Sequence, residues 1–315
     1  MEKIQVYIIT HNRPALLLNS IESVLIQSYS NIELIISDNS SNNLTKEVLE
    51  NKQYYPKLTY IKRKTLLGPI EHLNCVLKEI TANYFMIFHD DDVMSTNMIS
   101  ELYTAIVQNI GTIAVGANAV INKNGKDTKK LFLNSDQKNV ILNCRDDVVH
   151  GYLKAGNVPF PAYLYKKKIA TQLHFDISHG GKYCDVAFIM DIAALGRIIF
   201  LANPLMTYFY HKGQGSAKND FLDNIKLINY ITKTTKYNRK DPIVINFRLK
   251  NVYCELKSEL LNRYISVFSN RYFKILNLFF LNFHIKLMAK SFILGIWSLL
   301  SLSKLKYKIN KLQIL

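Results

Sequence analysis

Three consecutive carboxylates, Asp90, Asp91 and Asp92, follow an apolar run at residues 84–88. The run has the composition of a buried β-strand, so the acids stand directly at a strand end. Alternate residues of an extended segment face the same way, which would direct Asp90 and Asp92 together. Two carboxylates that close repel each other unless a proton or a cation lies between them. The pattern therefore indicates Mn2+ or Mg2+, which prefer hard oxygen ligands. The plainer alternative is a solvated acidic turn before the next helix.

Apolar strands and helical segments alternate through the first 110 residues. Strands are predicted at 4–9, 32–37, 58–63 and 84–88, and helices at 15–27, 45–51, 69–81 and 97–109. This alternation predicts βαβ units and an α/β fold with a mainly parallel sheet flanked by helices. The alternation loosens afterwards, with strands predicted at 112–121, 161–167 and 197–210, an Asn-Gly hairpin at 122–127 and a helix at 185–196. Residues 221–315 are predicted to be helical.

Polar side chains follow three of the four early strands. Thr10–Arg13 comes after the first strand, Asp38 after the second, and the three acids after the fourth. Ligands of open α/β sheets bind beyond the carboxyl ends of the strands, so these groups should meet there. The first turn lacks GxGxxG and the chain has no GxxxxGK[ST], which argues against a dinucleotide site and a P-loop. A nucleotide site without a glycine-rich loop would need a cation to neutralise a diphosphate.

Basic residues are concentrated at the C-terminal end of the chain. The formal net charge is +16, and residues 231–315 alone hold 16 Lys+Arg against 3 Asp+Glu. Residues 271–310 mix these cations with aromatic and aliphatic side chains, and their longest uncharged stretch, 291–303, is too short to span a bilayer. We expect helices that lie on an anionic membrane surface. A helical cap on the rest of the chain, or a homodimer through these helices, is the alternative. Nucleic acid is not expected as a partner, because the apolar content is too high.

The cysteines and the N-terminus suggest a cellular location. Four cysteines are widely spaced and form no CxxC pair, which is typical of reduced thiols in a cytosolic protein. The apolar run at residues 4–9 is too short for a signal peptide and fits a first strand. We therefore expect a cytoplasmic protein, held peripherally at the inner face of the plasma membrane.

The segment VYIITHNRPALLLNSIESVLIQSYSNIELIISDNSS, residues 6–41, resembles the opening of family 2 glycosyltransferases. FMIFHDDD continues the resemblance to that family's Asp-x-Asp element, and residues 181–216 resemble its acceptor-side helix and closing His loop. The resemblance covers residues 4–216 and implies the GT-A fold. Its implied parts are a nucleotide-sugar-binding half at 1–110, an acceptor-binding and catalytic half at 111–220, and a helical basic tail at 221–315.

The same resemblance implies a reaction. A hexosyl group would move, with inversion, from a nucleoside-diphosphate sugar, UDP-sugar being the first choice, to a saccharide or lipid-linked saccharide acceptor. The setting would be bacterial surface polysaccharide synthesis, and Mn2+ or Mg2+ would be required.

Site roles follow from the resemblance by position. The implied base and ribose contacts are Thr10, His11, Asn12, Arg13 and Asp38. Arg63 would help these residues to hold the base and the ribose. The alternative of equal weight is that Arg63 is a surface arginine without a role in binding. Asp91 would lie near the ribose or the donor sugar, and Asp90 and Asp92 would serve the metal and the diphosphate, with Asp92 as the preferred ligand. His89, beside the acids, is interpreted as packing or as an outer contact rather than as a ligand.

Two further roles fall on the second half of the chain. Asp185 occupies the family's general-base position, although the usual Glu-Asp pair is Cys184-Asp185 here. A plain helix N-terminal acid, or Asp191 as the base, is the alternative. In the segment YHKGQGS, His211 would contact the metal or the diphosphate, with a structural histidine as the alternative, and Lys212 would contact the diphosphate.

Two other functions compete with sugar transfer. A sugar-nucleotide pyrophosphorylase would need a glycine-rich loop with Lys or Arg after the first strand, and THNRPALLL is not such a loop. A non-catalytic nucleotide- or glycan-binding scaffold would lack turnover, and the missing acid beside Asp185 is the one feature in its favour.

Overall fold

A computed structural model describes residues 1–133, 138–156, 159–210, 220–261, 270–281 and 285–293. Strands and helices alternate in the first part as expected. The elements are β1 (Ile4–Thr10), α1 (Pro14–Leu25), β2 (Ile32–Asp38), α2 (Leu44–Glu50), β3 (Leu58–Lys62), α3 (Pro69–Glu79), β4 (Tyr84–His89), β5 (Val93–Met94) and α4 (Met98–Gln108).

The second part mixes antiparallel strands with longer helices. Its elements are β6 (Thr112–Lys123), β7 (Lys126–Leu131), β8 (Val140–Leu142), α5 (Arg145–Ala155), β9 (Tyr163–Lys166), α6 (Lys168–Gln172), α7 (Cys184–Leu195), β10 (Arg197–Tyr210), α8 (Phe221–Thr234), α9 (Pro242–Leu261) and α10 (Asn270–Leu281). The Asn-Gly hairpin between β6 and β7 is confirmed. Asn124 and Gly125 both have positive φ there, at 52° and 81°, as a type I′ turn requires.

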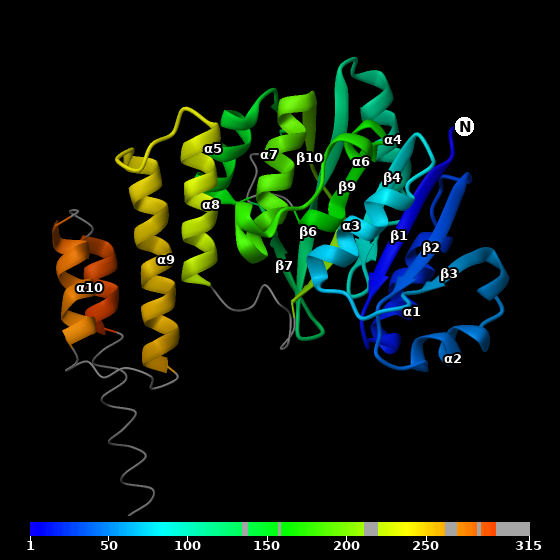
Figure 1. Cartoon of the computed structure of the whole chain (residues 1–315), viewed down its shortest axis with the longest axis horizontal. Coiled ribbons are helices and arrows are strands. Elements are labelled where there is room, and N and C mark those ends of the chain that lie inside the picture. Colours follow the sequence, from blue (N-terminus) through cyan, green and yellow to red (C-terminus); the bar gives the residue numbers. More distant parts are fainter. Residues whose placement is uncertain (134–137, 157–158, 211–219, 262–269, 282–284, 294–315) are drawn as a thin grey trace, which may run out of the picture.

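All strands join one sheet, in the order β3-β2-β1-β4-β9-β6-β10-β5, with β7 on β6 and β8 on β10 (Figure 1). The pairs β3–β2, β2–β1 and β1–β4 are parallel. Strand β9 then runs antiparallel to both β4 and β6. Since β9 joins the two parts, residues 1–110 and 111–210 share one continuous sheet.

Helices cover both faces of this sheet, so the early strands are apolar on both sides. Tyr7, Ile35, Phe85 and Ile87 point to the face that α3, α5, α7 and α8 cover. The alternate residues Val6, Ile8, Ile36, Met86 and Phe88 point to the face that α1 and α4 cover. The carboxyl ends of the strands are left as the open edge for a ligand.

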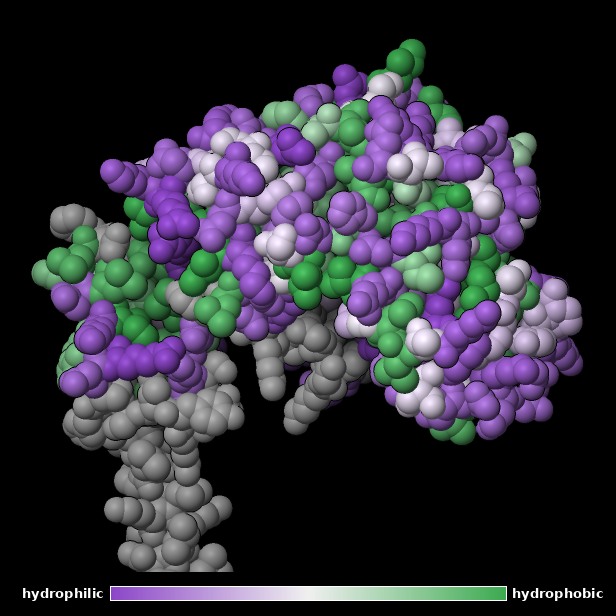
Figure 2. All heavy atoms as spheres, in the orientation of Figure 1, coloured by the Kyte–Doolittle hydropathy of each residue, from purple (hydrophilic) through white to green (hydrophobic). Residues whose placement is uncertain are grey.

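The C-terminal helices divide into two groups. Leu227, Ile228 and Ile231 of α8 are buried in the core beneath the sheet, and Val244 at the start of α9 joins them. Later residues of α9 pack instead with α10 and the helical segment 285–293 in a separate small core that contains Leu256, Leu260, Tyr272, Leu276 and Phe279. Green, apolar side chains gather on that outer part in Figure 2.

Among the described residues, no helix combines the length and the apolar character that a transmembrane segment needs.

The close approach of β6 and β9 generates a stability prediction. Gly116 pairs with Tyr163, and a Cβ at Gly116 would lie 2.5 Å from the Tyr163 ring. Gly116→Ala should lower the free energy of unfolding by about 1–3 kcal/mol, because the buried ring must move. Urea unfolding measures this change.

Gly151→Ala is the matched control, because it adds a methyl group within α5 where nothing lies within 4 Å. It should raise the free energy of unfolding by roughly 0.5–1 kcal/mol through helix propensity. A Gly116→Ala variant as stable as the wild type would show that the strands can separate without cost.

Candidate active site

The register of the sheet brings polar side chains into one row at its open edge. Thr10 pairs with Asp38, Asp38 pairs with Lys62, and Ile9 pairs with His89, so that Asp90 stands beside Thr10. The Thr10 hydroxyl donates a 2.7 Å hydrogen bond to Asp90 Oδ2. The three strand ends singled out in the sequence therefore meet, as parallel pairing requires.

Arg13 is the cation paired with the acids in this row. It lies just before α1, and Pro14 starts that helix at the carboxyl end of β1. Its guanidinium is 2.8 Å from Asp90 Oδ1 and 2.9 Å from Asp91 Oδ2. One arginine thus bridges two neighbouring carboxylates.

Asp92 differs from its two neighbours in its partners. Like Asp90 it is completely buried, and its Oδ1 accepts the backbone N–H of Phe209 in β10 at 3.0 Å. Its Oδ2 has no hydrogen-bond donor in the part of the chain that the structure describes. His89 Nδ1 lies 3.8 Å from this oxygen. A buried carboxylate oxygen of this kind requires a counter-charge or a proton.

A serine of α1 fixes the turn that carries the acids. The Ser20 hydroxyl lies 3.1 Å from the carbonyl oxygen of His89 and 2.5 Å from that of Asp92. Residues 90 and 91 form a turn rather than continuing β4. Ser20 thus holds both ends of this turn against α1. No sequence motif singles out this serine.

The turn also changes which acids converge. Ligand atoms of His89, Asp91 and Asp92 all lie within 4.8 Å of one another. The pair predicted from strand parity was Asp90 and Asp92, but parity holds only to His89, where β4 ends. Asp90 faces Thr10 instead, and the turn carries Asp92 toward His89. The nitrogen and oxygen donors, with the donor-free Asp92 Oδ2, fit a divalent cation.

Burial dominates the protonation of these acids. It raises the pKa of Asp90 to about 6, against the opposing effect of Arg13. Burial, together with the charge of Asp91, raises the pKa of Asp92 well above its ordinary value. In each case burial works against the charged form, and a cation bound beside these acids would stabilise the carboxylate.

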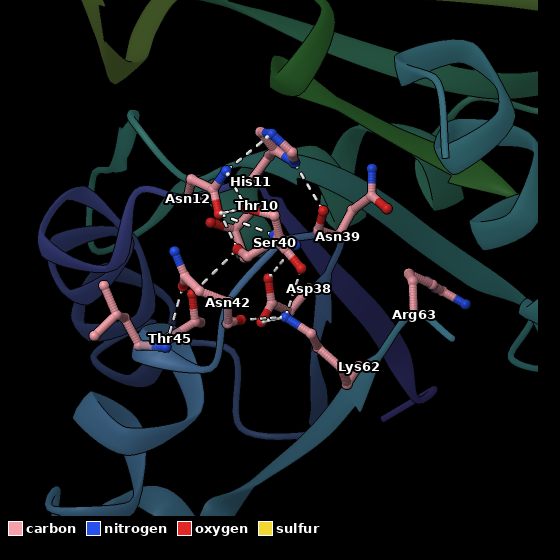
Figure 3. Close-up of polar contacts among 12 residues, drawn as sticks. Thr10, His11, Asn12, Asp38, Asn39, Ser40, Asn42, Thr45, Lys62 and Arg63 are labelled. Carbon is pink, nitrogen blue, oxygen red and sulfur yellow. Dashed lines mark hydrogen bonds and ion pairs between the residues drawn. The ribbon is translucent and has the colours of Figure 1, made fainter. Parts of the chain in front are cut away.

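Asp38 is the centre of a second polar cluster, shown in Figure 3. Its buried carboxylate accepts the Ser40 N–H at 2.8 Å, the Tyr60 hydroxyl at 2.6 Å and the Lys62 ammonium at 3.2 Å. Lys62 also donates to the carbonyl oxygens of Ser40 and Asn42. Both carboxylate oxygens thus already have protein donors, and the cluster shapes the loop after β2.

The turn after β1 presents the more accessible polar groups of this cluster. His11 Nδ1 lies 2.7 Å from the carbonyl oxygen of Asn39, and Asn12 Oδ1 accepts the Ser41 N–H at 3.0 Å. The side chains of His11 and Asn12 are exposed. These contacts tie the loops after β1 and β2 together.

Arg63 points away from this cluster, as Figure 3 shows. Its guanidinium forms a bidentate ion pair with Glu79 and donates to Ser37 Oγ at 2.6 Å. The side chain is 7% exposed. In this arrangement Arg63 links β3 to α3 and does not reach the open edge where it was expected to assist.

Asp185 lies in the first turn of α7, on the same face of the sheet as Phe85 and Ile87. It is half-buried, and its Oδ1 accepts the Val186 N–H at 2.9 Å. Burial raises the pKa of Asp185 to about 6. A carboxylate with a pKa close to neutrality is suited to accept a proton.

The turn that leads to Asp185 is held by α8. Gly181 has a φ of 58°, and a Cβ there would overlap the Asp223 carboxylate. The same carboxylate accepts the Lys182 N–H at 3.0 Å. The position of Asp185 therefore depends on a helix beyond residue 220.

Asp191, the alternative base, is engaged elsewhere. Arg145 and Tyr230 donate to its Oδ1 at 2.8 and 2.6 Å. This network ties α5 and α8 to α7. His211 and Lys212 lie outside the described residues.

The fold and the site together define an α/β protein whose sheet carries a cation-compatible acid cluster at the carboxyl ends of its parallel strands. Residues 5–174 match the family described as Glycosyl transferase family 2, which is more than half of the chain. The chain therefore belongs to glycosyl transferase family 2.

One protein of known activity is similar to part of this chain in sequence. A GalNAc(5)-diNAcBac-PP-undecaprenol beta-1,3-glucosyltransferase of Campylobacter jejuni is 28% identical over 148 residues, which is 46% of this chain and 47% of that protein. The chain thus aligns with about half the length of this relative.

Two solved structures share the fold. TarS 1-349 of S. aureus, in complex with UDP-GlcNAc, has a TM-score of 0.55 at 14% identity over 82% of this chain and 83% of TarS 1-349. The mannosyltransferase PcManGT of Pyrobaculum calidifontis, in complex with GDP-Man and Mn2+, has a TM-score of 0.57 at 13% identity over 94% and 87% of the two chains. The predicted GT-A fold is confirmed.

The burial of Asp92 generates a prediction about stability. A carboxyl group whose folded-state pKa lies above its unfolded value makes the protein less stable as the pH rises above about 4. Asp92→Asn removes this loss and keeps an oxygen acceptor for Phe209. Without divalent cations it should raise the free energy of unfolding at pH 8 by about 1–3 kcal/mol, the usual cost of an uncompensated buried group.

Urea unfolding in EDTA at pH 5 and pH 8 measures the effect, which should be smaller at pH 5. Asp176→Asn is the control of opposite sign, since hydrogen bonds from Ser178 lower the pKa of Asp176. It should weaken the fold slightly at pH 8. Destabilisation by Asp92→Asn at pH 8 would show that the charged carboxylate is already compensated within the protein.

Proposed function

We propose that this protein is an inverting, metal-dependent glycosyltransferase that moves a sugar from a nucleoside-diphosphate sugar to a lipid-linked saccharide. The observation that carries the proposal is the buried acid cluster at the carboxyl edge of the sheet, with a donor-free carboxylate oxygen on Asp92. Membership of glycosyl transferase family 2 supports the reaction class. The undecaprenol-linked substrate named for the Campylobacter relative supports the acceptor class.

Each end of the donor has a proposed binding region. The turn Thr10–Arg13 and the loop that Asp38 organises would hold the base and the ribose through the exposed polar groups of His11 and Asn12. Asp91 and Asp92 would hold the cation. We take UDP-sugar as the first donor to test, because a structure that shares the fold binds UDP-GlcNAc. Mn2+ is the first cation to test, because another such structure contains it.

The proposed chemistry transfers one proton and exchanges one bond. The acceptor hydroxyl oxygen bonds to the anomeric carbon while the bond from that carbon to the diphosphate oxygen breaks. The hydroxyl proton passes to the Asp185 carboxylate, and the nucleoside diphosphate leaves with the electron pair of the broken bond. A bound divalent cation would stabilise the charge on the leaving diphosphate. Attack opposite the leaving group inverts the anomeric configuration.

The role of Asp185 can be tested by pH dependence and by mutation. The carboxylate form is the base, so kcat/KM should rise with pH through about 6, the pKa to which burial raises this group. Asp185→Asn should lower kcat by about 10²- to 10⁴-fold, with little change in the donor KM. The assay measures release of nucleoside diphosphate from a panel of nucleotide sugars, with Mn2+ and a polyprenyl-diphosphate-linked saccharide.

Asp191→Asn is the matched control, because Asp191 is an acid of the same helix that is already paired with Arg145 and Tyr230. It should reduce stability and keep kcat within a few-fold. Turnover that survives in Asp185→Asn and disappears in Asp191→Asn would exchange the two roles. A wild-type protein that binds donors but never turns them over would favour the scaffold alternative.

A second part of the proposal concerns the outer helices. More than half of each of six large apolar side chains is exposed on α10 and the segment 285–293, namely Phe273, Phe280, Leu281, Ile285, Phe292 and Ile293. We call these six residues the outer apolar face. The exposed lysines Lys274, Lys286 and Lys290 lie among them, and residues 270–293 contain no acidic side chain. We propose that this face lies on an anionic bilayer.

Charge decides between a bilayer and a second copy of the chain. A two-fold dimer brings the same surface of both subunits together. Here it would bury lysines against lysines with no acidic partner on the outer apolar face. An anionic lipid surface instead attracts each lysine by about 1 kcal/mol and accepts the apolar side chains. The proposed location is therefore the cytoplasmic face of the plasma membrane, where a lipid-linked acceptor would be within reach.

Vesicle flotation tests this surface. The full chain should float with vesicles of phosphatidylglycerol and phosphatidylcholine and should not float with phosphatidylcholine alone. Lys286→Glu with Lys290→Glu should weaken binding by about 30-fold or more, on the basis of about 1 kcal/mol for each cation. Phe280→Ser with Ile285→Ser should also weaken it, because less apolar surface is buried in the lipid.

Ile110→Ser is the control, since Ile110 is 92% exposed but lies after α4, away from these helices. It should leave flotation unchanged. Failure to float, combined with a dimer in analytical ultracentrifugation that Phe280→Ser and Ile285→Ser dissociate, would assign the face to self-association.

A further inference from the structure

His89 has the geometry of a metal ligand, although a packing role was predicted for it. Its Nδ1 lies 3.8 Å from Asp92 Oδ2. One ligand atom from each of His89, Asp91 and Asp92 lies within 4.8 Å of the other two. Two ligands at about 2.1 Å from one cation are at most about 4.2 Å apart, so the widest of these separations would have to shorten slightly. Small side-chain movements would bring the three atoms to one ion.

The neighbouring acid is committed to other partners. Asp90 accepts the Thr10 hydroxyl and faces Arg13. Asp91 also contacts Arg13, at 2.9 Å through Oδ2, and in addition belongs to the group with His89 and Asp92. The turn held by Ser20 thus brings one imidazole and two carboxylates within 4.8 Å of one another, and Asp90 is not part of that group.

The other surroundings of His89 hold its ring in place. The ring contacts Phe160 with centroids 5.9 Å apart, and the side chain is partly buried. Asp92 Oδ2 is buried, and it has no hydrogen-bond donor among the described residues. That oxygen is the independent sign of a missing positive partner between Asp92 and the His89 ring.

We propose that His89 Nδ1 is a direct ligand of the divalent cation, together with Asp91 and Asp92. This inference rests on the metal requirement in the proposed function and adds a nitrogen ligand to it. Mn2+ and Mg2+ both accept carboxylate oxygens, but the transition metals, of which Mn2+ is the weakest binder, also take nitrogen ligands, whereas Mg2+ and Ca2+ are bound through oxygen. The site should therefore favour Mn2+ over Mg2+, and this preference should come from His89.

Pulsed electron paramagnetic resonance of the bound Mn2+ tests the ligand directly. The full chain with MnCl2 and UDP should show nitrogen-14 modulation, which nitrogen-15 histidine labelling should convert to nitrogen-15 modulation. The modulation should disappear in His89→Asn and persist in His211→Ala and in His179→Asn, a half-buried histidine of the α7 face. Mn2+ affinity should fall about 10- to 100-fold in His89→Asn, and Mg2+ affinity much less.

The outcomes separate this inference from the proposed function. Mn2+ that binds the wild type without histidine modulation, or with modulation lost only in His211→Ala, overturns the role of His89 and leaves the metal requirement intact. Failure of Mn2+ to bind the wild type contradicts the metal requirement itself. The labelling experiment on His211→Ala needs no change at residue 89, so it decides the question even if His89→Asn does not fold.

Discussion

The burial of three adjacent carboxylates at the end of β4 is the constraint on which the arrangement of the site depends. Such a cluster is costly in a medium of low polarity unless every charge is compensated. Among the described residues the compensation of Asp92 is incomplete, because its Oδ2 has no hydrogen-bond donor. Arg13 faces two of the acids, Thr10 donates to one, and a backbone amide of β10 donates to the third. Each partner comes from a different element. The position of these acids therefore depends on the register of β1, the start of α1 and the course of β10.

A second carboxyl group with a raised pKa lies at the start of α7. Burial raises the pKa values of Asp90 and Asp185 alike, each to about 6, but the two carboxyl groups have different surroundings. Asp90 lies beside the charged groups of Arg13 and Asp91, whereas Asp185 lies close enough to Tyr152 of α5 and Tyr163 of β9 to raise the pKa of each. The first environment suits binding of a cation and an anion together, and the second suits the transfer of a proton. Function is commonly located at such locally unfavourable sites.

Much of the fold could be predicted from local patterns. The run IQVYII and its three counterparts are rich in apolar residues on both faces, as expected of strands covered on both sides, and they are β1 to β4. The strands β5 and β8 escaped prediction because they have two and three residues, too few for a period to show. The helix α5 was missed because it carries Arg145, Asp146 and Asp147 at its start and has a weak apolar stripe.

The site was predictable in position but not in detail. Parallel pairing alone places Thr10, Asp38 and Asp90 at one edge, whatever lies between them in the sequence. The pairing of Arg63 with Glu79, and of Asp38 with Tyr60 and Lys62, depends on how β3 packs on α3 and on β2, which no local pattern records. Strand parity could not assign the acids, because the turn begins within the motif itself.

The packing of α8 changes where the catalytic unit can end. Leu227 and Ile231 fill the core beneath the sheet, and Asp223 holds the turn before α7. A chain cut at residue 220 would expose that core and free the turn. The helices that follow could be exchanged between related enzymes only from a point within α9, after Val244 has joined the main core. Recombination that exchanges the outer helices therefore has to join the two sequences inside the continuous helix α9.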